Sequence, residues 1–170
     1  RALGSLARER KRDRIAVGRD GRLSGPELVG ALSDGIRAAG VDVVDIGMVV
    51  TPMTYFAAVH LGTACSVMVT GSHNPPDYNG LKMVIDGTTL SGDDIQALRT
   101  RIERGEVAEG SGGMHTQDVG AAYFDRIASD VKLARPMRIA VDCGNGVAGA
   151  YAPALYRRLG CEVLVLFCEV

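Results

Sequence analysis

The feature that most constrains the fold is a strand–loop–helix–strand pattern that occurs twice. The run RIAV stands at 14–17 and again at 138–141. Each copy precedes a Gly-rich loop, a helical stretch that ends in glycine and a second apolar run, at 41–47 and 162–167. Two strands joined in this order by a helix are typical of a βαβ unit with parallel strands. The pattern therefore predicts an α/β protein.

The chain between the two copies continues the alternation. We expect further strands at 64–70 and 81–85, and helices that begin at Pro26 and at Thr51 as an N-cap, and that span 91–105 and 119–131. In the first of these helices, Leu28, Leu32 and Ile36 share one face. The stretch 109–118 is rich in glycine and is expected to be a flexible loop. These elements predict a layered α/β/α sandwich with a largely parallel, mixed sheet.

The repetition has two readings. Two βαβ units can look alike by coincidence, or the chain carries a duplicated α/β domain. On the second reading, a domain over 1–135 lacks its N-terminal part, and a truncated second copy begins near Pro136 and covers 136–170. Since the chain opens on Arg1 within a basic amphipathic pattern and stops on a strand-like run, we expect it to be a fragment.

Composition excludes several classes of protein. Residues are 46% apolar and 23% charged, and the net charge is −1, so no basic surface for nucleic acid or anionic membrane is expected. No apolar run is long enough to span a bilayer. Three dispersed histidines give no zinc motif. Four scattered cysteines, two of which border apolar runs, suit reduced thiols in a cytoplasmic protein.

The stretch TGSHNPPDYNG, at 70–80, is longer than a plain turn needs. It follows an apolar strand, at the edge where α/β sheets place ligand crevices. Gly71 allows a sharp bend, while Pro75 and Pro76 keep the segment out of the sheet. Lys82 can return toward Ser72 from the next strand. On residue types alone, the stretch is either a rigid surface turn or a site. The hydrolase motif G-x-S-x-G is not met.

The segments TGSHNPPDYNGLK, VGRDGRLSG (17–25), GMVVTP (47–52) and VDCGNGVAG (141–149) occur in an order that resembles the α-D-phosphohexomutases, within them the phosphomannomutase/phosphoglucomutase group. The similarity covers essentially the whole chain. Phosphoglucosamine mutases typically carry Ala where Gly71 stands, so this position favours hexose substrates.

The resemblance implies an isomerase that exchanges the 1- and 6-phosphates of glucose or mannose. Ser72 matches the family's phosphoserine, which gives its phosphoryl group to a sugar phosphate and receives another from the 1,6-bisphosphate. One phosphoserine oxygen would bind Mg²⁺. His73 and Lys82 would shape the phosphate environment, with Lys82 the candidate for proton transfer, and Asn74 would hold the loop. Glucose 1,6-bisphosphate is the implied intermediate and activator, and the intact enzyme is expected to be monomeric.

Two Gly-rich loops admit two readings each. The loop around Asp20 and Arg22 could cradle a phosphate, or form an Asp–Arg brace for the serine loop, which we favour. The loop 142–149 contains G-x-G-x-x-G letters but is expected to be the βα turn of the second copy.

By resemblance, the carboxylate metal ligands and the sugar-recognition segments lie outside this chain, so the fragment is expected to be inactive alone. A non-catalytic phosphate- or nucleotide-binding module is the alternative function, and a serine hydrolase is third.

Overall fold

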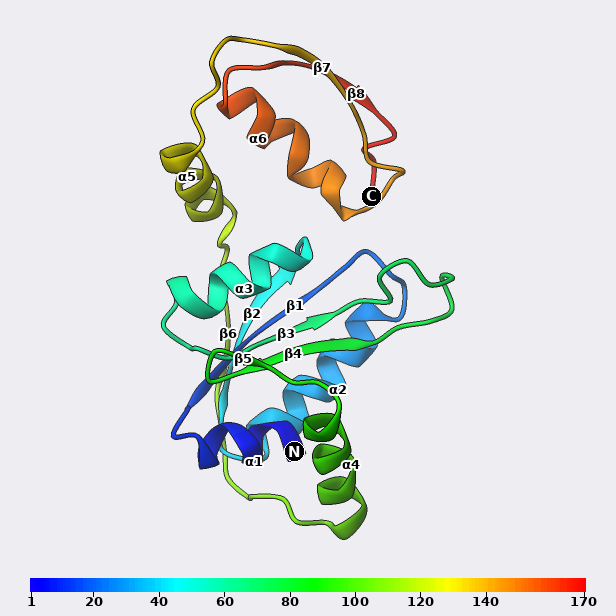
Figure 1. The fold of residues 1–170 in the computed structure, drawn as a ribbon. Coiled ribbons are helices and arrows are strands. Elements are labelled where there is room, and N and C mark those ends of the chain that lie inside the picture. The colour runs from blue at the N-terminus through cyan, green and yellow to red at the C-terminus, as the bar shows by residue number, and fades with distance from the viewer.

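The computed structural model describes all residues, 1–170 (Figure 1). The strands are β1 (Arg14–Arg19), β2 (Asp42–Met48), β3 (Ser66–Val69), β4 (Leu81–Ile85), β5 (Thr88–Thr89), β6 (Met114–Thr116), β7 (Arg138–Asp142) and β8 (Glu162–Leu166). The helices are α1 (Ala2–Glu9), α2 (Gly25–Arg37), α3 (Thr51–His60), α4 (Asp93–Arg104), α5 (Gly120–Asp130) and α6 (Ala152–Arg158), with one 3₁₀ turn, η1 (Val147–Ala150). No helix is both long enough and apolar enough to cross a membrane.

Six strands form one mixed sheet in the order β5-β4-β3-β1-β2-β6. Strand β1 pairs in parallel with β2 and β3, and β2 pairs in parallel with β6. Strands β3, β4 and β5 pair antiparallel. The parallel strands are buried on both faces, which is why they are almost continuously apolar.

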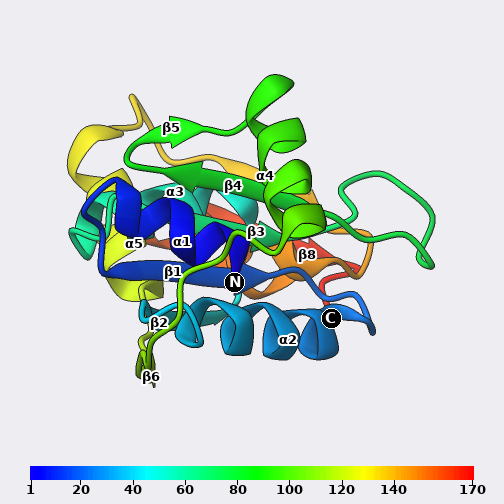
Figure 2. The same ribbon diagram turned by 90° about the horizontal axis from the view of Figure 1, so that it is seen from below.

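The sheet is covered on both faces, so the first unit has three layers. Helix α3 lies on one face, and α1, α2 and α4 lie on the other (Figures 1 and 2). Because side chains of a strand alternate between faces, Ile15 and Val17 of β1 join the core beneath α1 and α2, whereas Ala16 joins Met53 and Ala57 of α3. The α/β/α sandwich expected from the sequence is confirmed.

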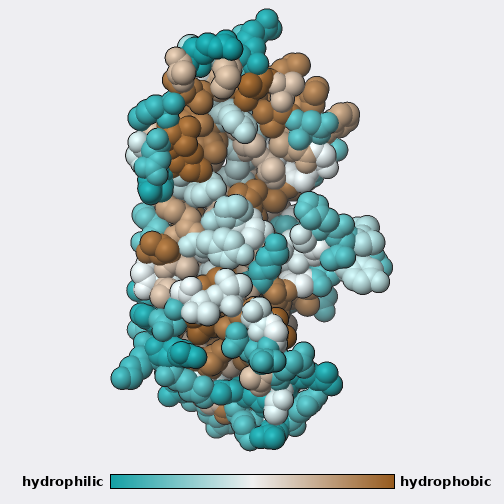
Figure 3. All heavy atoms as spheres, viewed as in Figure 1, coloured by the Kyte–Doolittle hydropathy of each residue, from teal (hydrophilic) through white to brown (hydrophobic).

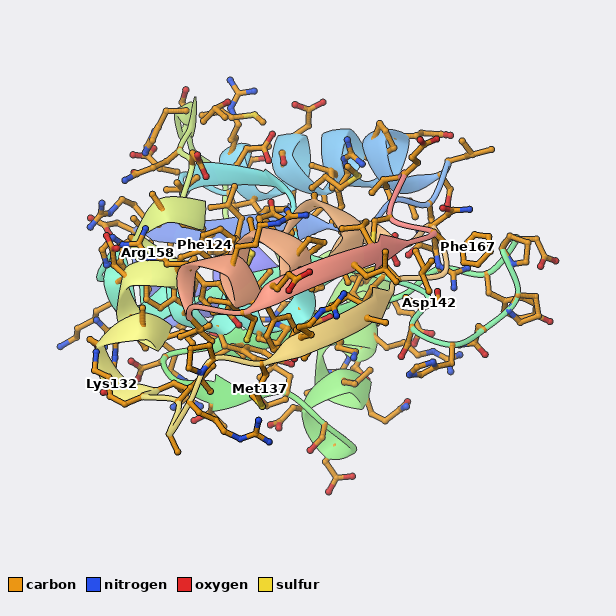
Figure 4. All side chains as sticks on the ribbon, turned by 90° about the horizontal axis from the view of Figure 1, so that it is seen from above. Phe124, Lys132, Met137, Asp142, Arg158 and Phe167 are labelled. Atoms are coloured by element: carbon orange, nitrogen blue, oxygen red, sulfur yellow. The ribbon has the colours of Figure 1, made fainter.

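The second RIAV run begins β7, which pairs in parallel with β8. Helix α6 packs against this two-stranded sheet, so the element order repeats that of β1–α2–β2. Helix α5 connects the two units. Seen from above, Asp142 and Phe167 lie at the end toward which the 70–80 loop projects, and Phe124 and Arg158 lie at the other end (Figure 4). The hydroxyl of Tyr151 donates to the carbonyl of Met48 (2.7 Å) and so ties the units together.

The expectation of a flexible loop over 109–118 was wrong in part. Residues Met114–Thr116 form the edge strand β6, which extends β2 in register from Val43 to Asp45. Three residues are too few to show a strand period, so only the tertiary pairing identifies this strand. The main sheet therefore reaches Thr116.

Two details of helix placement also differ. Leu28 of α2 is 40% exposed, and the core-facing residues are Val29, Ser33 and Ile36. Leu32 packs against the same core and Ile36 is fully buried, so only Leu28 departs from the expected face, and the neighbouring Val29 takes the buried position. Thr51 is the first residue of α3, and Val50 occupies the cap position without a side-chain cap.

Candidate functional site

An open cleft of about 740 Å³ lies at the carboxyl end of the parallel strands. It runs between the loop after β3 and the loop after β7, and the surface is hollowed beside the projecting 70–80 loop (Figure 3). Its polar and glycine lining comes from three loops and the start of α3: Asp20, Gly21, Arg22, Thr51, Thr70, Ser72, His73, Asn74, Gly144, Asn145 and Gly146. Parallel α/β sheets place ligands at this edge.

Ser72 stands at the rim of this cleft with its side chain exposed. Its backbone has φ = +53°, a left-handed conformation that is uncommon for residues other than glycine. The Ser72 N–H donates to Thr70 Oγ1 (2.9 Å), and the Ser72 carbonyl accepts from Arg22 (3.1 Å). The hydroxyl oxygen takes part in none of the hydrogen bonds within the chain. Ser72 is thus fixed through its backbone, while its hydroxyl is left open to the cleft.

The guanidinium of Arg22 organises the loop around Ser72. It donates to four carbonyl oxygens of the loop: Ser72 (3.1 Å), Asn74 (2.7 Å), Pro75 (2.5 Å) and Tyr78 (2.8 Å). With these bonds its donors are directed at the protein backbone, so it is poorly placed to bind a phosphate as well. These contacts connect the loop after β1 to the loop that carries Ser72.

Asp20 connects this guanidinium to the end of β3. Its Oδ1 accepts a hydrogen bond from the backbone N–H of Arg22 (3.0 Å), and its Oδ2 lies 3.3 Å from Nε of the Arg22 side chain. Oδ2 also accepts the Thr70 hydroxyl (2.7 Å). Both charged side chains are only 14% exposed. Because the pair is largely removed from water, its hydrogen bonds are stronger than those of an exposed ion pair.

Gly71 and Asn74 shape the start of the loop. A Cβ atom on Gly71 would lie 2.3 Å from Arg22 Cζ, so the absence of a side chain here lets the guanidinium approach the loop backbone. The side-chain amide and the backbone N–H of Asn74 both donate to the Gly71 carbonyl (3.0 Å each). At the loop's other end, Asn79 Nδ2 donates to Ser24 Oγ (2.9 Å).

His73 and Lys82 occupy different positions relative to the cleft. His73 is exposed and contributes to the cleft wall. Lys82 is the second residue of β4, where it pairs with Met68 of β3. Cross-strand partners point to the same face, so Lys82 lies on the face where Met68 lines the cleft, but it is not itself in the lining.

The loop 142–149 forms the opposite wall of the cleft. It follows β7 and precedes α6, as the sequence predicted for a βα turn. Gly144 (φ = +52°) and Asn145 (φ = +54°) both have left-handed backbone conformations. The Gly144 N–H donates to Asp142 Oδ1 (2.9 Å), so the turn is closed by its own side chain.

No cluster of three or more His, Cys, Asp or Glu side chains in residues 1–170 could hold a metal ion. The carboxylates nearest the cleft are engaged, since Asp20 is bonded to Arg22 and Thr70. The cleft lining therefore holds no cluster of carboxylates that could enclose a cation.

Thr70 is the residue of this arrangement that the sequence reasoning missed. It ends the buried stretch after β3, is 8% exposed, and links Ser72 to Asp20. The sequence did contain a signal, because the hydroxyl of a threonine in a turn commonly accepts a hydrogen bond from the backbone N–H two residues later.

Comparison with known proteins shows which family the chain resembles. Residues 1–109 match the family model described as phosphoglucomutase/phosphomannomutase, alpha/beta/alpha domain I. The chain belongs to the phosphoglucomutase/phosphomannomutase family. The curated relatives include the phosphomannomutase/phosphoglucomutase of Pseudomonas aeruginosa, 53% identical over 170 residues, and the phosphoglucomutase of Neisseria gonorrhoeae, 51% identical over 172 residues.

A solved phosphoglucomutase/phosphomannomutase family protein from Burkholderia thailandensis superposes on the whole chain with a TM-score of 0.95 at 53% identity. Both curated relatives are longer than this chain. The matches cover the whole of this chain, which corresponds to 37% of the length of each curated relative and 39% of the solved chain. The family membership predicted from the four sequence segments is confirmed.

Proposed function

We propose that this chain carries the phosphoryl-donor part of a phosphohexomutase, in which Ser72 is the phosphorylated residue. The observation that carries the proposal is the free Ser72 hydroxyl, held at the cleft by a braced loop in a chain of this family. Relatives named phosphomannomutase/phosphoglucomutase and phosphoglucomutase support the reaction class. The substrate would be a hexose monophosphate of glucose or mannose.

The proposed chemistry transfers a phosphoryl group in both directions. The Ser72 Oγ–P bond breaks as a free sugar hydroxyl forms its own bond to phosphorus and loses its proton, which gives a 1,6-bisphosphate such as glucose 1,6-bisphosphate. After the sugar turns around, Ser72 Oγ attacks the other phosphate and releases the isomeric monophosphate. Phosphoryl transfer depends mainly on positioning and electrostatic stabilisation, and the braced loop would supply the positioning.

A phosphoserine carries about −1.5 to −2 charges at neutral pH and needs nearby positive charge. Arg22 is engaged with the loop backbone, so we assign this role to His73 and Lys82. Lys82 would also exchange the proton of the attacking hydroxyl. Gly71, Asn74, Asp20 and Arg22 would keep the loop in place.

Mg²⁺ is the metal that the family resemblance implies. With no carboxylate cluster in residues 1–170, this chain would contribute only an oxygen of the Ser72 phosphate. When bound, the ion would neutralise charge on the transferring group. We further propose that residues 1–170 alone do not turn over, that the intact enzyme is monomeric, and that it works in the cytoplasm.

The test uses the natural full-length chain that contains these residues. Ser72→Ala should abolish the interconversion of glucose 1-phosphate and glucose 6-phosphate, and a peptide containing Ser72 should carry an added mass of ~80 Da, that of one phosphoryl group. Ser91→Ala is the matched control, because Ser91 is also exposed but lies outside the cleft. Full activity of Ser72→Ala would overturn the proposal.

A further inference from the structure

The left-handed backbone of Ser72 must be held by its surroundings. A residue with a Cβ atom loses about 1–2 kcal/mol in this conformation, and the exposed Ser72 side chain has no hydrogen bond that offsets this loss. Both peptide groups around Ser72 are nevertheless fixed, its carbonyl by Arg22 and its N–H by Thr70.

The Thr70 hydroxyl is oriented so that it can only accept from Ser72. A hydroxyl has one proton and two acceptor lone pairs. Thr70 gives its proton to Asp20 Oδ2 (2.7 Å), and an ionised carboxylate can only accept. The lone pairs of Oγ1 are thereby turned to the Ser72 N–H at 2.9 Å.

The position of Thr70 makes this contact well defined. The residue is 8% exposed, and its own backbone N–H donates to the Gly80 carbonyl (2.9 Å), which closes the base of the loop. Thr70 therefore sits on the rigid end of the sheet, while Ser72 is the first exposed residue beyond it. A rigid support of this kind is what a precisely oriented reacting atom requires.

We propose that Thr70 is a positioning residue that fixes the backbone of Ser72 and so aims the phosphoryl-carrying Oγ into the cleft. The inference rests on the proposed function, because it assumes that Ser72 carries the phosphate. Thr70 touches neither the substrate nor the phosphoryl group in this role; it acts through the Ser72 N–H.

The test compares Thr70→Val with Thr70→Ser in the natural full-length chain. Valine keeps the shape but removes the hydroxyl, whereas serine keeps the hydroxyl. Loss of one oriented hydrogen bond corresponds to about a tenfold change in rate. We expect Thr70→Val to lower both kcat and the single-turnover rate of phosphoryl transfer from Ser72 by about tenfold, while KM changes less than about twofold. In Thr70→Ser, kcat and the single-turnover rate should both stay close to those of the parent.

Thr63→Val is the matched control. Thr63 precedes β3 just as Thr70 follows it, is 3% exposed, and donates its hydroxyl to the Cys65 carbonyl (2.8 Å). A purely structural role for Thr70 would give both valine variants the same profile, with lower thermal stability and unchanged kcat, and would overturn the proposal.

A measurement without substitution covers the case in which Thr70→Val does not fold. In the unsubstituted protein, the Ser72 amide should exchange with solvent deuterium at least about tenfold more slowly than the His73 amide, which donates no hydrogen bond. Equal exchange would refute the contact. If instead Ser72 never carries phosphate and Ser72→Ala stays active, the proposed function fails, whatever the exchange result.

Discussion

Replacing Arg22 should disorder the serine loop while leaving the rest of the fold largely intact. The side chain bridges two segments that are far apart in the sequence, and it makes four hydrogen bonds to carbonyls of the loop. Arg22→Met keeps the apolar stem but removes every donor. Arg22→Lys keeps the charge, but a single ammonium group cannot reach the acceptors that a planar guanidinium spans.

The magnitude follows from these contacts. A hydrogen bond contributes about 0.5–1.5 kcal/mol net, and the loop carbonyls of Ser72, Asn74, Pro75 and Tyr78 can be rehydrated when Arg22 is lost, so we take the lower part of that range. Four bonds then favour the ordered loop by about 2–4 kcal/mol, which corresponds to roughly two orders of magnitude in its population.

The assay is hydrogen exchange of peptides that cover 70–80, which reports the population of the ordered loop. The unfolding temperature of each variant is measured as well. In Arg22→Met we expect loop exchange to rise strongly and kcat to fall, with Arg22→Lys between that variant and the parent. Arg99→Lys is the control, since Arg99 pairs with Glu103 of the same helix and makes no hydrogen bond to the loop. Unchanged exchange of the loop in Arg22→Met would refute the brace.

Three further predictions concern other parts of the chain. Gly71→Ala should displace the Arg22 guanidinium, whose Cζ would lie 2.3 Å from the new Cβ, and so raise the hydrogen exchange of the 70–80 loop. Gly30→Ala in helix α2 places its Cβ in open space and should stabilise the protein by about 0.5–1 kcal/mol in urea unfolding. Ile36→Ala should cost about 2–5 kcal/mol of unfolding free energy, because Ile36 is fully buried, and Leu28→Ala on the same helix less than about 1 kcal/mol. Burial, the neighbouring Cys168 thiol and the Asp142 carboxylate raise the pKa of Cys143 to about 11, so its alkylation should reach half-maximal rate near that pH and stay slow at pH 9.0, its ordinary pKa. A midpoint near 9.0 would contradict this prediction.

Much of the architecture could be predicted from the sequence because its patterns are local. The RIAV runs, the glycines that end helices and the Pro26 start all mark elements that the structure contains. The short strand β6 could not be predicted, because three residues in a Gly-rich stretch acquire strand geometry only by pairing with β2. The sequence pattern placed Leu28 on the buried face of α2, but Leu28 is 40% exposed and the neighbouring Val29 is buried instead.

The candidate site shows the same division. The resemblance and the Gly/Pro pattern led to Ser72 and to its loop, and Asp20 and Arg22 were expected nearby. The sequence could not show that one guanidinium serves four carbonyls, since this depends on the distance between two loops some fifty residues apart. It also gave Thr70 no role, because the orientation of its hydroxyl depends on Asp20 across the sheet edge.

The central claim is that Ser72 gives and receives the phosphoryl group during turnover. The most direct measurement is a rapid-quench single turnover of the natural full-length chain, labelled with ³²P on Ser72 and mixed with glucose 1-phosphate. If Ser72 carries the group, the label should leave Ser72 and appear in sugar bisphosphate at least as fast as kcat. Label that stays on Ser72 while product forms would contradict it.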